Sequence, residues 1–221
     1  GYDIKDNLKA VLGDFDKYEY LHFAFGLFVG AIILFRVIYG FFGNRYSNFK
    51  DFPISIKNQI SFIAHFFKYD KTYIGHNPVA SIVMLGIFIV GILCSISGFT
   101  LYSVENPSFL NINFNEDFLE EVHEILANLF LILVVIHLIG LFTDLLFHSK
   151  TKTLQSIFTG YKSVQGENSK QSTFHTIFSV IWLIVPFLAF VYGNNLKTKS
   201  ENDKSKVEHY EKNERHDEDD D

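Results

Sequence analysis

The sequence predicts an all-α integral membrane bundle with four transmembrane helices, and three observations support this fold class. Apolar residues make up 48% of the 221-residue chain. They gather into four runs, each close to the roughly 20 residues that an α-helix needs to span a bilayer. Polar connections separate these runs, and their positive charges are concentrated in two of the connections, as expected of a multi-pass protein.

Each apolar run is interpreted as one membrane-spanning helix. The first opens with His22, and Gly26 and Gly30 follow at i+4 and i+8 on the same face, where small residues let a helix or a flat ring approach closely. The second begins beside Pro78, a residue that suits the first turn of a helix. The predicted spans are residues 21–42, 79–101, 122–147 and 174–192.

Charges in the connections set the expected orientation. Connection 43–78 carries five Lys or Arg residues against two acids, and connection 148–173 carries four lysines against one acid. Connection 102–121 holds five acids and no Lys or Arg. By the positive-inside rule, the two basic connections lie in the cytoplasm and the acidic one lies outside. The net charge of −6 argues against a nucleic-acid partner.

The first basic connection also contains an expected amphipathic helix. Its apolar residues recur at helical spacing, with lysines and other polar residues on the opposite side. Such a helix is predicted to lie on the membrane surface. The apolar residues are Ile56, Ile60, Ile63 and Phe67.

Histidines inside the spans are the candidate functional residues. His123 and His137 lie fourteen positions apart on the third span, nearly four turns, so they share one face at about 21 Å separation along the axis. His22 opens the first span at the same outer depth as His123, because the two spans run in the same direction. Imidazoles within a bilayer are costly and mark cofactors, ion paths or partners. Haem is the natural candidate, and the alternative is that the histidines only pack helices together.

His22 and His123 can bracket one haem near the outer surface. His137 lies deeper and needs a partner, which is either His76 or a residue on a helix before Gly1. His76 precedes a proline and would have to cover about 15 Å of depth. We therefore expect one six-coordinate haem in this chain, and two once a preceding helix is added. Cys94 is the single cysteine, so any haem is held non-covalently.

Short motifs spread over residues 20–162 carry a family resemblance. They are Leu21-His22 with Gly26, LFRVIYGFFG at 34–43 with Arg45-Tyr46 and Phe49, Gly75-His76-Asn77-Pro78, Ser97-Gly98 with Leu101-Tyr102, Glu121-Val122-His123-Glu124 with Ala127-Asn128, His137, and Thr159-Gly160 with Lys162. In this ensemble the chain resembles the bacterial cytochrome b561 and nickel–iron hydrogenase b-type cytochrome family of di-haem membrane subunits.

The resemblance implies roles for individual residues. His22 and His123 look like the ligands of an outer haem b, and His137 looks like one ligand of an inner haem b. In this family the other inner ligand lies on a first helix, which we expect this chain to lack, in keeping with a glycine at residue 1. His76 is expected to contact a propionate or to position the haem, in preference to ligating it. Basic candidates for propionate partners, by charge, are Arg36 and Arg45.

The resemblance also divides the chain into domains. Residues 1–20 are an expected periplasmic lead-in, and 21–162 form the cytochrome b-type haem-binding membrane domain. Residues 174–192 add a transmembrane helix beyond the family core. The last stretch, 193–221, is rich in charge and ends in consecutive acids, so we expect a disordered acidic tail.

Two histidines on each iron leave no open site, which favours electron transfer over oxygen chemistry. The resemblance implies an electron-transfer subunit of a membrane oxidoreductase, and not a stand-alone enzyme, in the bacterial inner membrane. It would pass electrons between the quinone pool and a periplasmic partner such as a hydrogenase or a c-type cytochrome. The rival hypothesis is a non-redox membrane anchor or transporter subunit, whose histidines are structural or relay protons.

Overall fold

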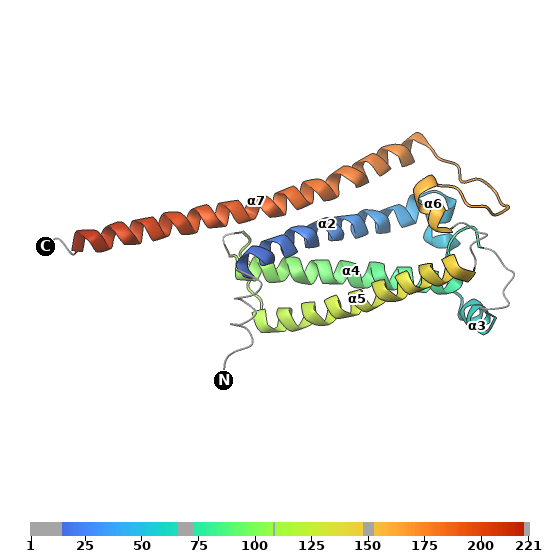
Figure 1. Ribbon diagram of the computed structural model, residues 1–221, viewed down its shortest axis with the longest axis horizontal. Coiled ribbons are helices and arrows are strands. Elements are labelled where there is room, and N and C mark those ends of the chain that lie inside the picture. The colour runs from blue at the N-terminus through green and yellow to red at the C-terminus, as the bar shows by residue number, and fades with distance from the viewer. Residues whose placement is uncertain (1–14, 66–72, 108, 148–152, 219–221) are drawn as a thin grey trace. The chain divides into compact units, whose positions relative to one another are not determined.

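The computed structural model describes the backbone of residues 15–65, 73–107, 109–147 and 153–218 (Figure 1). These residues form helices joined by turns, and no strand occurs among them, which confirms the all-α class. The elements are α2 (Phe15–Phe42), the short 3-10 helices η1 (Arg45–Ser47) and η2 (Phe49–Asp51), α3 (Ile56–Ala64), α4 (Pro78–Glu105), α5 (Glu116–Phe147), α6 (Thr153–Thr159) and α7 (Thr173–Glu218).

Four helices in the described part of the chain are long and apolar enough to cross a membrane. Large apolar side chains on them are mostly exposed, as in Leu183 at 67% and Phe142 at 59%. Such exposure suits a surface that faces lipid, because acyl chains cover apolar groups without cost. The candidate spans are Tyr20–Phe42, Pro78–Glu105, Glu116–Phe147 and Thr173–Leu196.

The chain forms two compact units. The larger unit, residues 32–182, contains α3 to α6, the C-terminal part of α2 and the start of α7. Within it α4 and α5 lie side by side (Figure 1). Its buried core consists of Ile33, Ile87 and Phe88, with partly buried apolar residues of α2, α4 and α5 packed around them.

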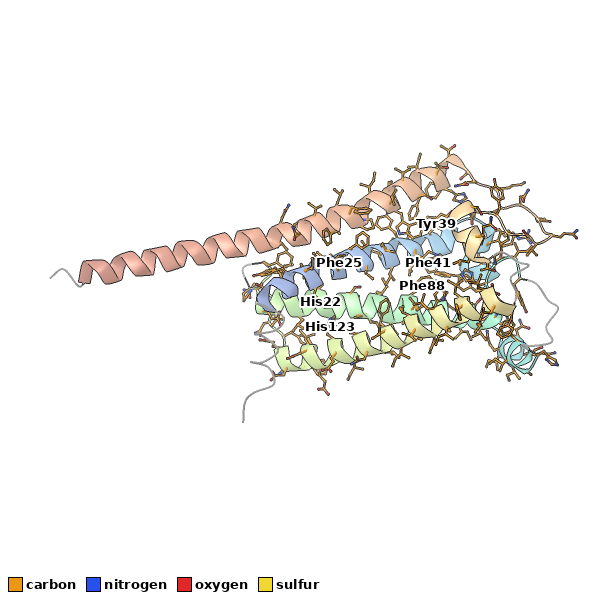
Figure 2. The ribbon with its side chains drawn as sticks, viewed as in Figure 1. His22, Phe25, Tyr39, Phe41, Phe88 and His123 are labelled. Carbon is orange, nitrogen blue, oxygen red and sulfur yellow. The ribbon has the colours of Figure 1, made fainter. Side chains whose placement is uncertain are left out.

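In this larger unit, aromatic side chains join α7 to α2. The ring of Tyr39, labelled in Figure 2, stacks on Phe178 with centroids 5.5 Å apart. The indole Nε1 of Trp182 donates a hydrogen bond to the carbonyl oxygen of Ile32 at 3.1 Å. The bond satisfies a polar group that would be costly to leave unpaired in an apolar setting.

The second unit combines residues 1–31 with 183–221, and in it the same two helices meet again. Phe28 on α2 packs edge to face against Phe187 on α7, at 5.3 Å between ring centroids. Gly193 permits close approach of the backbones, since a Cβ there would lie 2.9 Å from Cα of Ala24. Helix α7 is therefore packed against α2 within each unit.

Helix α7 continues to Glu218, where sequence composition predicts disorder from residue 193. Charge density predicts disorder when apolar residues are few, but charged residues such as Glu, Lys and Arg also have high intrinsic helix propensity, so the same composition is compatible with a helix.

The connection before α4 is held by polar side chains. Asn77 caps α4 by accepting a hydrogen bond from the backbone N–H of Ala80 at 2.8 Å, and Pro78 occupies the first turn as predicted. Gln59 of α3 donates to the carbonyl oxygens of Pro53 and Pro78, at 3.1 and 2.8 Å. These bonds fix α3 to the start of α4.

The amphipathic pattern predicted within the first basic connection corresponds to α3. Ile56, Ile60 and Ile63 are 75%, 64% and 66% exposed, while Phe62 is buried. Phe67 lies outside the described residues. The apolar face of α3 is thus uncovered by the described protein, and its position on a membrane surface stays a prediction.

Candidate haem-binding sites

His123 lies on α5 and faces a short stretch of α4 (Figure 2). Its Nδ1 is 3.0 Å from the hydroxyl oxygen of Ser97 and 3.9 Å from the sulfur of Cys94. The same hydroxyl donates to the carbonyl oxygen of Cys94 at 2.9 Å. Ser97 is 6% exposed and the imidazole is half-buried. Nδ1 of the ring therefore lies against the buried hydroxyl of Ser97 on the neighbouring helix.

Gly98 allows the imidazole to approach α4. A Cβ at this position would lie 2.7 Å from Cε1 of His123 and 3.2 Å from Nδ1. A side chain here would displace the ring, because carbon atoms prefer separations of about 3.5 to 4 Å. The Ser97-Gly98 pair thus supplies a hydrogen-bond partner and the space for one histidine.

A second cluster of residues gathers near the cytoplasmic end predicted for the spans. We define the basic cluster as Arg36 of α2, His76 before α4, His137 of α5 and Lys162 after α6. Arg36, His137 and Lys162 all lie close enough to His76 to affect its ionisation. Burial of His76, followed by the charges of Arg36, Lys162 and His137, lowers the pKa of His76 to about 4. The ring is therefore neutral near pH 7.

Aromatic rings enclose the basic cluster. The guanidinium carbon of Arg36 lies 5.3 Å from the centroid of Phe88 and 5.9 Å from that of Phe49. The imidazole of His76 packs against Phe52 with centroids 4.7 Å apart. Nη1 of Arg36 and Nδ1 of His76 are buried, and neither has a hydrogen-bond partner among the described residues. Each of these two buried polar atoms therefore remains available for a hydrogen-bond partner.

The side chain of Lys162 links the two basic connections of the chain, 43–78 and 148–173. Its Nζ donates to the carbonyl oxygens of Gly75 at 3.2 Å and Tyr73 at 3.5 Å. Burial lowers the pKa of the Lys162 ammonium, and the carboxylate of Asp144 opposes that shift. These bonds hold the backbone that precedes His76 against the segment after α6.

The structure distinguishes the two arginines that sequence proposes as propionate partners. Arg36 belongs to the basic cluster, whereas Arg45 pairs with Glu167 and has Asp51 at 4.0 Å. Tyr46 strengthens the link by donating to the backbone carbonyl of Glu167 at 2.6 Å. Arg45 therefore has carboxylate partners within the chain, and Arg36 does not among the described residues.

His137 is among the groups whose charge affects the ionisation of His76, and the His76 ring packs on Phe52. The expectation that His76 positions a haem and does not ligate it stays a prediction. His22 is exposed on the part of α2 that belongs to the other unit, so its pairing with His123 stays a prediction.

Two residues of these sites gain a role from the structure alone. Ser97 and Lys162 both belong to the matching motifs, but the sequence assigns neither of them a contact. Their partners lie 26 residues away for Ser97 and 87 and 89 residues away for Lys162. The sequence feature that could have indicated this role for Ser97 is a small polar residue next to a glycine within an apolar helix.

Comparison with known proteins gives a consistent result. The family described as prokaryotic cytochrome b561 matches residues 4–160. The chain is 31% identical over 117 residues to a probable Ni/Fe-hydrogenase 1 B-type cytochrome subunit of Escherichia coli strain K12, covering 47% of this chain and 50% of that protein. It is 30% identical over 118 residues to a probable Ni/Fe-hydrogenase B-type cytochrome subunit of Azotobacter vinelandii, covering 47% and 49%.

The chain spans about half the length of the curated relatives it matches. A probable Ni/Fe-hydrogenase B-type cytochrome subunit of Bradyrhizobium diazoefficiens is likewise 30% identical over 118 residues, or 48% of its length. No solved structure matches the chain.

Proposed function

Because the chain belongs to the prokaryotic cytochrome b561 family, we propose that it carries electrons across a bacterial membrane on b-type haem held by its histidines. The observation that carries the proposal is the setting of His123 on α5. Its imidazole is held through Nδ1 by Ser97 and lies against Gly98, inside an apolar helix long enough to span a bilayer. A histidine held in this way presents its second nitrogen in a fixed direction.

The residues present fit haem b. Haem needs axial ligands, apolar walls and cationic partners for its two carboxylates. The histidines of α5 supply imidazole, and the basic cluster supplies Arg36 Nη1 and His76 Nδ1, which are buried and have no partner among the described residues. A carboxylate beside Arg36 would satisfy Nη1 and relieve the cost of burying a cation.

We assign the residues as follows. His22 and His123 would ligate the outer haem, and His137 would be one ligand of the inner haem. Arg36 and His76 would contact carboxylates of the inner haem, since they share the site with Lys162, another cationic group. Arg45 is the weaker candidate because Glu167 already pairs with it. When bound, haem supplies a reversible one-electron couple, and two imidazoles on one iron leave no position for oxygen.

The remaining parts of the proposal concern partners and place. The curated relatives are named as hydrogenase cytochrome subunits, which supports a hydrogenase-type redox partner at the periplasmic face. A c-type cytochrome is the alternative partner. Quinone within the inner membrane is the proposed electron carrier at the other end. The chain would then serve as the membrane subunit of a larger oxidoreductase.

The test is a reversible absorption spectrum of the purified protein and of two variants, His22→Ala and His123→Ala. Each variant should lose one reversible b-type component while accumulating in membranes at the normal level. His65→Ala is the control, because this exposed histidine at the end of α3 bonds only locally, to the carbonyl of Ser61. An unchanged haem-to-protein ratio in both variants would refute the assignment, and a wild-type protein without haem would favour the non-redox anchor.

A further inference from the structure

We propose that Ser97 is a positioning residue that fixes the tautomer of His123 and thereby tunes this histidine as a haem ligand. The inference rests on the proposed function, because it concerns the same haem. It assigns a role to a residue of α4 that touches the ligand and not the iron. The proposal is based on the position of the Ser97 hydroxyl, which lies between the Cys94 carbonyl and Nδ1 of His123.

As a first step, the hydrogen bonds of the Ser97 hydroxyl determine where the proton of the His123 imidazole lies. A serine hydroxyl has one proton to donate and lone pairs to accept with. Ser97 donates its proton to the Cys94 carbonyl at 2.9 Å. Toward Nδ1 of His123, at 3.0 Å, the same oxygen can then only accept. This arrangement assigns the proton to Nδ1, and the lone pair of the neutral imidazole then lies on Nε2, the nitrogen that can bind a metal.

The hydroxyls along α4 support this direction for the Ser97 proton. Ser95 donates to the carbonyl of Gly91 at 2.8 Å, Thr100 to that of Ile96 at 2.8 Å, and Ser103 to that of Phe99 at 2.7 Å. Serine and threonine in an apolar helix commonly satisfy their proton on the preceding turn. Ser97 follows the same rule, and within the described part of the chain it is the one of these four whose hydroxyl also contacts a histidine ring.

The second step concerns the geometry around the bond. Ser97 is 6% exposed, so solvent does not compete strongly for its oxygen. The space at Gly98 brings the ring within reach, and the sulfur of Cys94 at 3.9 Å is only a weak second acceptor for the same proton. The hydroxyl of Ser97 is therefore the principal acceptor for Nδ1–H in the described structure.

The third step gives the functional consequence. A hydrogen bond from Nδ1–H shifts electron density onto the imidazole and makes Nε2 a stronger donor. A stronger donor stabilises the ferric iron more than the ferrous iron, and so lowers the midpoint potential of the haem. Loss of the bond should act in reverse, raising the midpoint potential and weakening the retention of ferric haem.

The experiment compares Ser97→Ala with Ser95→Ala in the full chain. Ser95 is the matched control, because it lies on the same helix and its hydroxyl donates to the backbone carbonyl of Gly91. We expect Ser97→Ala to weaken haem retention by about 10- to 100-fold, the usual effect of removing an outer partner of a metal-bound histidine. Its outer-haem component should also titrate at a higher potential. Ser95→Ala should match the wild type in both measurements.

Two further variants keep the test decisive. Ser97→Thr retains a hydroxyl acceptor and should keep the wild-type potential. If Ser97 mattered only through the size of its side chain, the larger threonine would not be expected to do so. Ser97→Cys places a weaker acceptor at nearly the same size, so its potential should lie between those of wild type and Ser97→Ala. If Ser97→Ala does not accumulate, this pair still reports the dependence on acceptor strength.

The outcomes separate this inference from the proposed function. If the wild type binds haem through His123 and the potential is the same in Ser97→Ala, Ser97→Cys and Ser95→Ala, the role of Ser97 is refuted and the function stands. If wild-type protein holds no haem, or His123→Ala retains the full complement, the proposed function fails first.

Discussion

Gly98 and His123 lie so close that an alanine methyl at position 98 would stand 2.7 Å from Cε1 of the imidazole. Separations this short fall well inside the contact distance of carbon atoms, so one of the two groups would have to move. The helix backbone of α4 is constrained by its hydrogen bonds, and the ring is the part able to rotate. The position of this histidine thus depends on a glycine of the neighbouring helix.

Gly98→Ala is therefore predicted to remove the outer haem while leaving the protein in the membrane. The displaced ring loses its bond to Ser97 and its direction toward the iron. Gly86→Ala is the control, because its added methyl meets only the Leu133 methyl groups, at 3.4 Å, and a Gly-to-Ala change otherwise favours a helix. Haem-to-protein ratios of the two purified variants measure the effect. Equal ratios would show that the Gly98 contact has no bearing on haem.

In protein that carries both haems, Arg36 and Arg45 should differ in their effect on the inner haem. Arg36→Gln removes a buried cation with an unpartnered nitrogen, and we expect haem affinity to fall by about tenfold or more, since a hydrogen bond to a charged group contributes about 1.5 to 3 kcal/mol. The midpoint potential should also decrease, because a lost positive charge favours the ferric state. Arg45→Gln should leave both quantities unchanged. A redox titration showing equal shifts in both variants would contradict the assignment.

The sequence was sufficient to predict the membrane-spanning helices, because the length and apolarity of a run of residues determine whether it can span a bilayer. The start of α4 at Pro78 and the presence of a helix at residues 56–64 also followed from local patterns. The continuation of α7 to Glu218 was not predicted, because a composition rich in charged residues indicates disorder but is also compatible with a helix.

The sites were predictable only in part, because their decisive contacts join distant parts of the chain. By sequence, Arg36 and Arg45 are both candidate propionate partners by charge alone. The structure separates them, because Arg45 pairs with Glu167, while Nη1 of Arg36 is buried and has no hydrogen-bond partner within the described part of the chain. In the same way, the sequence does not show that Lys162 bonds to the carbonyl oxygen of Gly75 or that the ring of His76 packs on Phe52, because these contacts join residues far apart in the chain.

The orientation of the spans can be tested with reporter fusions. Asn111 is exposed in the acidic connection between α4 and α5, which is expected to face the periplasm. A reporter that works only after export should be active when fused after Asn111. Fused after Ser163, in the basic connection, the same reporter should be inactive, while a cytoplasmic reporter should show the reverse pattern. Activity of the exported reporter at Ser163 would invert the proposed topology.

The last prediction concerns the docking of a redox partner at the outer face. Four carboxylates at the start of α5 are exposed, and the connection that leads to them carries no Lys or Arg. A partner that docks there should present lysine or arginine, because complementary charge raises the rate of encounter. The four residues are Glu116, Asp117, Glu120 and Glu121.

Electron entry should then slow by on the order of tenfold between about 0.1 M and about 1 M salt, as the Debye length falls from about 10 Å to about 3 Å. The double variant Glu120→Gln, Glu121→Gln should start slower at low salt and depend less on ionic strength. Asp51→Asn, which removes a carboxylate from the basic connection, should follow the wild-type salt curve. Rates of haem reduction by the partner, followed by absorbance, provide the measurement. A wild-type rate that is indifferent to salt would instead support a permanently bound subunit with an apolar contact.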